Sequence, residues 1–207
     1  MSMGQGFHGL RAETPDNLVL DAGIVYFNID ESKLKAVLPA VASVTDALAA
    51  GSKAGATRGG ASFASNKENR PVEADGIRFP VKGLQRIDAY APTLTMSLLE
   101  VGDRENLQRM LASYVKTTHQ LHDEYQLSVE VDDADYVDNV ALVAKHTLSQ
   151  TPGILVLRNV LVVESFEVSF EDKNEAVVEV KFLGHALLSA PHDSPFSWYV
   201  PIAEAGS

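Results

Sequence analysis

Hydrophobic and polar residues alternate along much of this chain, and this alternation predicts β-strands. In the segment Thr93–Val101, apolar side chains occupy positions 94, 96 and 98, while threonine or serine occupies positions 93, 95 and 97. A period of two places the apolar side chains on one face of a half-buried strand. The segment Asn17–Asn28 also predicts strand structure, with a kink at Gly23.

The apolar period changes after Gly102 and then predicts one helix, over Arg104–Lys116, lying on a β core. Asp103 is in the position of an N-cap, whose side chain accepts a hydrogen bond from the first helical turn. A further helix is predicted from near Pro39 to near Gly51, because proline is tolerated in the first turn but not in the interior. The helix over Arg104–Lys116 is predicted from four apolar residues with the i, i+3, i+4, i+7 spacing of an amphipathic helix: Leu107, Met110, Leu111 and Tyr114.

The second half of the chain is again rich in predicted strands. The last two are predicted to form a hairpin around Asp172–Asn174, because apolar residues alternate on both arms. Since no low-complexity linker or internal repeat divides the chain, we predict a single domain over residues 1–207. It includes a flexible N-terminal arm (about 1–16), a long insertion or loop (about 30–58) and an irregular C-terminal tail (about 191–207). The predicted strands are Leu127–Val131, Val137–Leu148, Ile154–Val163, Ser165–Phe170 and Glu175–Leu183.

Composition and charge narrow the functional classes. The chain of 207 residues has a formal net charge of −11, which argues against a nucleic-acid reader, since such proteins concentrate lysine and arginine. Because the chain has no cysteine, it has no disulfide, no thiolate metal site and no cysteine nucleophile. No signal peptide and no run of about 18 apolar residues is seen, so we expect a soluble protein that is cytoplasmic when made.

Two clusters resemble metal sites without meeting their requirements. His119 and His122 are spaced i, i+3, whereas the zinc-protease pattern needs i, i+4 and a glutamate between, so a solvated loop is favoured. The segment Gly51–Gly60 lacks the order of a phosphate-binding loop, and no G-x-S-x-G occurs. We therefore expect no catalytic residue, no metal, no cofactor and no enzyme. The second of the two metal-like clusters is a group of acidic residues that lacks the spacing of a calcium loop: Glu130, Asp132, Asp133, Asp135 and Asp138.

The most informative segment is Gly55–Leu99, where glycine-containing turns separate strand-like runs. Glycine is favoured where the backbone takes a positive φ or two backbones approach closely, so these turns are predicted to be fixed corners of a β framework. The basic residues beside them either form salt bridges to the acidic edge of a neighbouring copy or are individually solvated. These residues are Arg58, Arg70, Arg78, Lys82 and Arg86.

The order of these corners resembles the major tail protein, or tail tube subunit, of long non-contractile-tailed bacteriophages. The resemblance covers most of the chain, including an opening T-P-D-N-L-x-L-D-A-G-x-V-Y and a closing strand that ends in Gly-His. It is carried by Thr14–Tyr26, Gly55–Gly60 (GATRGG), Glu73–Gly83 (EADGIRFPVKG), Leu98–Glu100 and Val177–His185.

The resemblance implies a β-sandwich or distorted barrel with one flanking α-helix. Six copies would form a ring, and rings would stack into a hollow tube through which genomic DNA passes without specific binding. It implies a structural protein of the virion tail, in the host cytoplasm during assembly, without membrane insertion. Its partners would be itself, a tape measure protein, and tail terminator and tail-tip proteins. The candidate interface or turn residues are Gly55, Thr57, Arg58, Gly59, Gly60, Asp75, Gly76, Arg78, Lys82, Gly83 and Arg86.

The strands expected to line the lumen are the arms that flank the central turn, Ala61–Glu73 and Ile87–Val101, with one strand of the second half. Part of the negative charge is expected to face the channel, where it would repel DNA phosphates. The alternatives are the tube protein of a contractile tail or injection machine, and a monomeric β-sandwich binding module of a virion. A metal hydrolase built on His119 and His122 is the least favoured.

Overall fold

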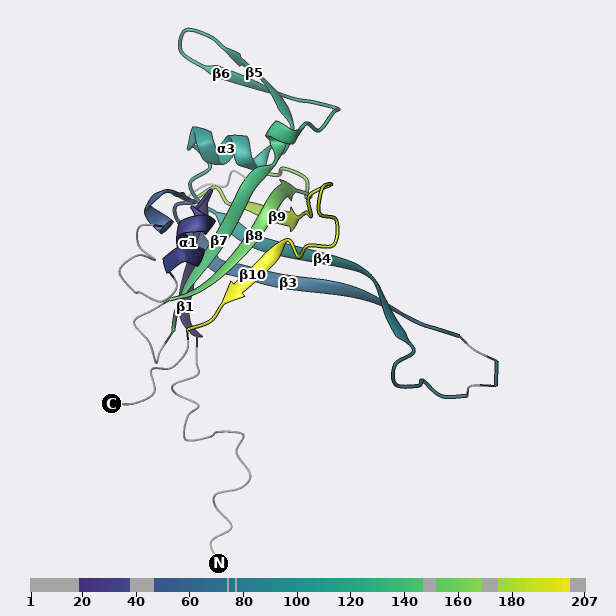
Figure 1. Ribbon diagram of the computed structural model, residues 1–207. Helices are drawn as coiled ribbons and strands as arrows, with labels where there is room; N and C mark the ends of the chain where they lie inside the picture. Colours follow the sequence, from purple (N-terminus) through teal and green to yellow (C-terminus); the bar gives the residue numbers. More distant parts are fainter. Residues whose placement is uncertain are drawn as a thin grey trace, which may run out of the picture.

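The chain forms a predominantly antiparallel β structure, shown by a computed structural model (Figure 1). The structure describes residues 19–37, 47–73, 75–76, 78–146, 152–168 and 175–201. Its helices include α1 (Glu31–Val37), α3 (Arg104–Met110) and the 3-10 helix η2 (Asp133–Asp135), and residues 47–49 are also helical. Its strands are β1 (Val19–Phe27), β2 (Ser52–Lys53), β3 (Thr57–Pro71), β4 (Gln85–Leu98), β5 (Tyr114–Thr118), β6 (Asp123–Leu127), β7 (Val137–His146), β8 (Gly153–Val162), β9 (Val178–Gly184) and β10 (Phe196–Tyr199).

Eight of these strands belong to one sheet, with the order β2-β1-β7-β8-β9-β4-β3 and β10 paired to β8. The sheet forks along β8, because residues 154–157 pair with β10 while residues 160–162 pair with β9. Asn159 lies at the fork with a φ of 46°, and its side-chain amide donates to the carbonyl oxygen of His185 over 3.0 Å. Strands β5 and β6 form a separate two-stranded hairpin.

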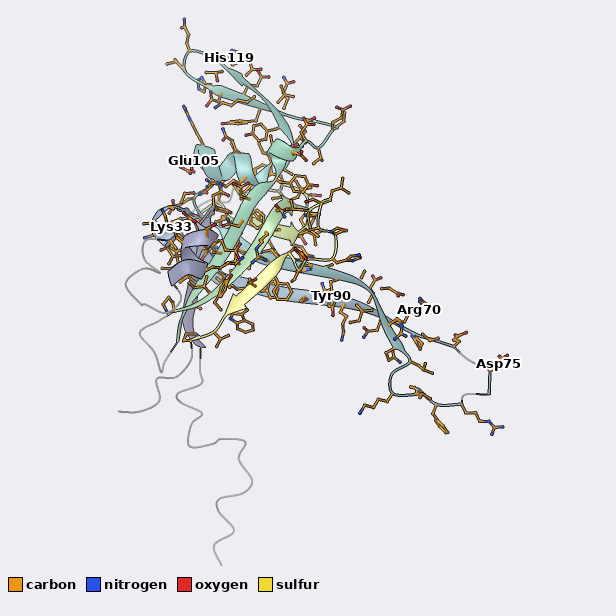
Figure 2. The ribbon with its side chains drawn as sticks, in the orientation of Figure 1. Lys33, Arg70, Asp75, Tyr90, Glu105 and His119 are labelled. Atoms are coloured by element: carbon orange, nitrogen blue, oxygen red, sulfur yellow. The ribbon has the colours of Figure 1, made fainter. Side chains whose placement is uncertain are left out.

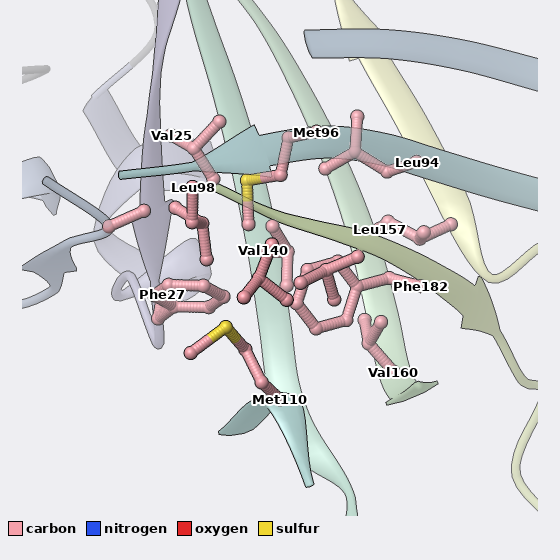
Figure 3. Packing of buried hydrophobic residues seen from close by; sticks show 13 residues of the cluster. Val25, Phe27, Leu94, Met96, Leu98, Met110, Val140, Leu157, Val160 and Phe182 are labelled. Carbon is pink, nitrogen blue, oxygen red and sulfur yellow. The ribbon is translucent and has the colours of Figure 1, made fainter. Parts of the chain in front are cut away.

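The larger of two buried apolar clusters lies on the inner face of the curved sheet, where β1 also contacts β3 (Figure 3). The smaller cluster includes Leu34 of α1 and Ile154 and Val156 of β8. Leu94, Met96 and Leu98 are 0%, 2% and 0% exposed, which confirms the face predicted from their alternation. The rings of Phe27 and Phe182 meet edge to face with centroids 5.8 Å apart, a favourable aromatic geometry. The prediction of a mainly β fold with a flanking helix is confirmed, with α3 covering the core.

Helix α3 begins where the sequence predicts and ends earlier. The side chain of Asp103 accepts a hydrogen bond of 2.9 Å from the backbone nitrogen of Asn106, as expected of an N-cap. The predicted end at Lys116 is wrong, because the helix stops at Met110 and Ala112 takes a φ of 59°. The following residues are rich in β-branched side chains, which favour strands, and they form β5 of the hairpin.

Other predicted elements differ in their partners or limits. The hairpin of Ser165–Phe170 with Glu175–Leu183 is wrong, since residues 165–168 form no strand and β9 pairs with β4 and β8. The strand predicted at Leu127–Val131 is also wrong beyond its first residue, where β6 ends. Helix α1 was not predicted, and most of the helix from Pro39 to Gly51 lies outside the described residues. The stretch predicted as an irregular tail contains β10.

Candidate assembly surface

The outer halves of β3 and β4 form a two-stranded arm, residues 64–91, that projects from the body of the molecule (Figure 1). Figure 2 shows Tyr90, Arg70 and Asp75 in succession along it. Residues 93–98 of β4 pair with β9, whereas within the described chain the strands of the arm pair only with each other. An isolated two-stranded ribbon is marginally stable in water, and its unpaired edges can template pairing with another chain. The arm is therefore the candidate assembly element.

The end of the β3–β4 hairpin opposite the tip of the arm is the Gly55–Gly60 corner, which lies against the body. Gly55 has a φ of 85°, and a side chain there would meet the carboxylate of Glu100 at 2.5 Å. That carboxylate accepts a hydrogen bond of 2.9 Å from the backbone nitrogen of Ala56. Gly59 and Gly60, with φ of 76° and 82°, occupy the register shift between Thr57 and Ala61. The predicted corner is thus a β-bulge that starts the long hairpin.

The tip of the arm, residues 72–84, holds the second predicted corner. Its ends are joined by a hydrogen bond of 2.7 Å from the backbone nitrogen of Val72 to the carbonyl oxygen of Leu84. Gly76 and Gly83 have φ of 83° and 94°, as their predicted turn positions require. The tip lies about 14 residues of strand beyond the Gly55–Gly60 corner, or roughly 45 Å. The structure therefore separates the predicted interface residues into two groups.

The basic residues at these turns have different surroundings. Arg58 pairs with Glu175 at 2.7 Å and Arg70 with Asp88 at 3.0 Å. Arg86 donates to the carbonyl oxygens of residues 83 and 85 at the neck of the tip. Arg78 and Lys82 form no ion pair with any residue that the structure describes. They are the basic groups of the tip that remain open to a partner.

A second projection, the β5–β6 hairpin, carries His119 in its turn (Figure 2), and His122 lies in the same turn. His119 contacts Glu124 at 2.9 Å, and no group of three potential metal ligands occurs among the described residues. An ion pair of Asp123 with Arg104 at 3.4 Å holds the hairpin to α3, and a second one with Lys116 of β5 at 3.1 Å lies within the hairpin. A hydrogen bond from Thr118 is the main reason that the pKa of Asp123 is lowered.

Sequence reasoning missed an ionic cluster on the body that joins α1 to β8 and β10. Arg158 donates to both carboxylate oxygens of Glu31, one of them at 2.6 Å, and to the hydroxyl of Ser197 at 2.6 Å. Tyr199 donates to Glu31 over 3.0 Å. The hydrogen bonds from Arg158 lower the pKa of Glu31 to about 2. This cluster fixes β10, and no local sequence signal marks it.

No helix in the described residues has the length and apolar composition needed to cross a membrane.

Comparison with known proteins gives only low-scoring structural likenesses. No protein-family model matches the chain, and no curated protein does. A chain from the virion of a native gene transfer agent particle matches with 8% identity and a TM-score of 0.41, over 86% of this chain and 95% of that chain. A chain from the 6-fold symmetrised anti-feeding prophage baseplate matches with 12% identity and a TM-score of 0.42, over 82% and 92%. At these scores we draw no argument about function from either likeness.

Proposed function

We propose that this chain is a structural subunit, not an enzyme, that polymerises into the tube of a phage tail. The observation that carries the proposal is the arm. Nearly all of the described residues between 64 and 90 are exposed, including the large apolar side chains of Ile87, Tyr90 and Phe79. A monomer gains nothing from extending a marginal ribbon into water, whereas a neighbouring copy would cover these side chains and pair their strand edges.

The position of the arm favours a ring or tube over a closed dimer. The arm leaves one side of the body, so its receiving surface on another copy is a different part of the chain. Contacts between two different surfaces are heterologous, and repeated heterologous contacts build rings when the rotation closes and filaments when it does not. Six-membered rings that stack into a tube are the form that the sequence resemblance implies.

Charge is distributed in a way that suits such an assembly. Residues 66–88 of the arm carry five basic and four acidic side chains, although the whole chain has a net charge of −11. Residues 123–138 carry seven carboxylates and no lysine or arginine. A nearly neutral arm reduces repulsion between acidic copies, while acidic surface directed into a channel would keep DNA phosphates from binding.

The proposed partners follow from this role. Copies of the chain would form the rings, and a tape measure protein, a tail terminator and tail-tip proteins would set the length and ends of the tube. Genomic DNA would pass through the lumen during ejection without specific contacts. The assembled protein would lie in the virion tail, after assembly in the host cytoplasm.

Negative-stain electron microscopy of the purified chain, over a range of protein and salt concentrations, tests the proposal. Six-fold rings or hollow tubes are expected. Monomers at every condition, also after addition of purified tail-tip complexes, would contradict it and favour a monomeric virion binding module. A sheath around the tubes in particles would instead indicate a contractile tail or injection machine.

A further inference from the structure

An apolar groove of about 230 Å³ lies on the body where β10 meets the sheet. Leu155 forms part of its buried floor, while Phe63, Leu142 and Pro201 line it together with Trp198. Trp198 is 61% exposed, which is high for the largest apolar side chain. The groove is smaller than the roughly 300–1,000 Å³ of small-molecule sites, so it suits one side chain of a protein partner.

The tip of the arm carries a matching apolar side chain. Phe79 is 80% exposed and is followed by Pro80 and Val81, which is 45% exposed. Proline fixes its own φ and restricts the backbone of the residue before it, so the backbone at Phe79 has less conformational freedom to lose on docking. The tip lies far from β10 in the same molecule, because the arm points away from the body (Figures 1 and 2). Phe79 therefore has no access to the groove of its own chain.

We propose that Phe79 of one copy docks into the groove beside Trp198 of a second copy. This inference rests on the proposed function and names the surface that receives the arm. An aromatic side chain in an apolar pocket next to tryptophan has the composition of an interface hot spot. Arg78 and Lys82 flank Phe79, and their positive charge complements a receiving chain whose net charge is −11.

Trp198 is the one tryptophan of the chain, so its fluorescence reports on the groove directly. The test mixes two full-length variants that cannot make this contact alone. Phe79→Ser keeps the groove and its tryptophan but loses the side chain that docks. Trp198→Glu keeps the arm but blocks its own groove and is silent in tryptophan fluorescence. Both substituted side chains are exposed, so both variants are expected to fold.

Titrating the Trp198→Glu variant into the Phe79→Ser variant is expected to give a saturable blue shift of tryptophan emission and lower quenching by acrylamide. A donor that carries Phe79→Ser as well as Trp198→Glu is expected to bind at least roughly 30-fold more weakly, the loss typical of a hot spot. The matched control donor carries Leu121→Ser with Trp198→Glu, since Leu121 is an equally exposed residue at the tip of the other hairpin. This control is expected to bind as the Trp198→Glu donor does.

Several results would overturn the docking. They are an unchanged emission on mixing, a shift that persists with the doubly substituted donor, or a Trp198 already shielded in the Phe79→Ser variant alone at low concentration. The last would mean that a segment of the same chain fills the groove. If the unmodified chain forms rings while Trp198 stays open to acrylamide, the docking fails and the proposed function stands. If the two variants give a saturable shift on mixing but the unmodified chain forms no rings or tubes, the docking stands and the proposed function fails.

Discussion

The guanidinium group of Arg158 donates hydrogen bonds to both carboxylate oxygens of Glu31, a residue 127 positions earlier in the chain. Arg158 also donates to the carbonyl oxygen of Ser194 over 3.1 Å and to the hydroxyl of Ser197. One side chain of β8 thus positions both α1 and the approach to β10. Because Trp198 lies in β10, this ion pair also stabilises one wall of the apolar groove.

The substitution Glu31→Gln is expected to lower the free energy of unfolding at pH 7 by about 1.5–3 kcal/mol, the range for a hydrogen bond to a charged group. The pKa of Glu31 is lowered from 4.5 to about 2 in the folded chain, so the carboxylate stabilises the fold above pH 4.5. That contribution is lost as pH falls toward 2, so the free energies of unfolding of the unmodified chain and of Glu31→Gln should converge in acid. Urea unfolding of both proteins across this pH range measures the difference in their free energies of unfolding.

The matched control for this prediction is Glu164→Gln. Glu164 pairs with Lys181 at 3.1 Å on the surface, and exposed pairs contribute about 1 kcal/mol or less. Equal effects of the two substitutions at pH 7, or a Glu31→Gln effect that does not shrink in acid, would contradict the role assigned to Arg158 and Glu31.

Asn139 is expected to be the most sensitive polar position of the core. Its amide accepts from the backbone nitrogen of Ile29 at 2.8 Å and donates to the carbonyl oxygen of the same residue at 3.0 Å, as a neighbouring strand would. Asn139→Ala leaves both buried groups without a partner and should cost about 2–4 kcal/mol in thermal or urea unfolding. Asn69→Ala, on the exposed arm, should change stability by less than about 0.5 kcal/mol. If Asn139→Ala also costs less than about 0.5 kcal/mol, water takes over the hydrogen bonds that the amide makes with Ile29.

The corner at Gly55 should tolerate a side chain less well than the tip of the arm. Gly55→Ala and Gly76→Ala both place alanine at a positive φ, which costs about 1–2 kcal/mol. Only at Gly55 does the added carbon also meet a carboxylate, that of Glu100, whereas nothing lies within 4 Å at Gly76. The larger loss in the free energy of unfolding is therefore expected for Gly55→Ala. Equal losses would show that Glu100 moves aside without cost.

Local patterns in the sequence predicted those parts of the fold that depend on local periodicity. The face formed by Leu94, Met96 and Leu98 follows from a period of two, and the start of α3 follows from the capping position of Asp103. The glycine corners were also predicted, because a positive φ leaves a signature in residue type.

The remaining features depend on contacts between distant residues. Helix α3 ends at Met110 despite an apolar spacing that continues to Tyr114, because β6 pairs with that segment. The pairing of Glu31 with Arg158 has no local signal at all. The two long strands on either side of the central turn were predicted and are β3 and β4, but the candidate interface residues were predicted as one set, whereas this ribbon holds Arg58 and Arg78 far apart.

The central claim is that the tip of the arm serves assembly and is not needed for folding. Its most direct test replaces the tip, residues 72–84, by a two-residue Asn-Gly turn and compares this variant with the unmodified chain by sedimentation velocity and thermal unfolding. We predict an unchanged unfolding temperature and a variant that stays monomeric at concentrations where the unmodified chain forms larger species. A shortened variant that assembles as well as the unmodified chain, or one that no longer folds, would contradict the claim.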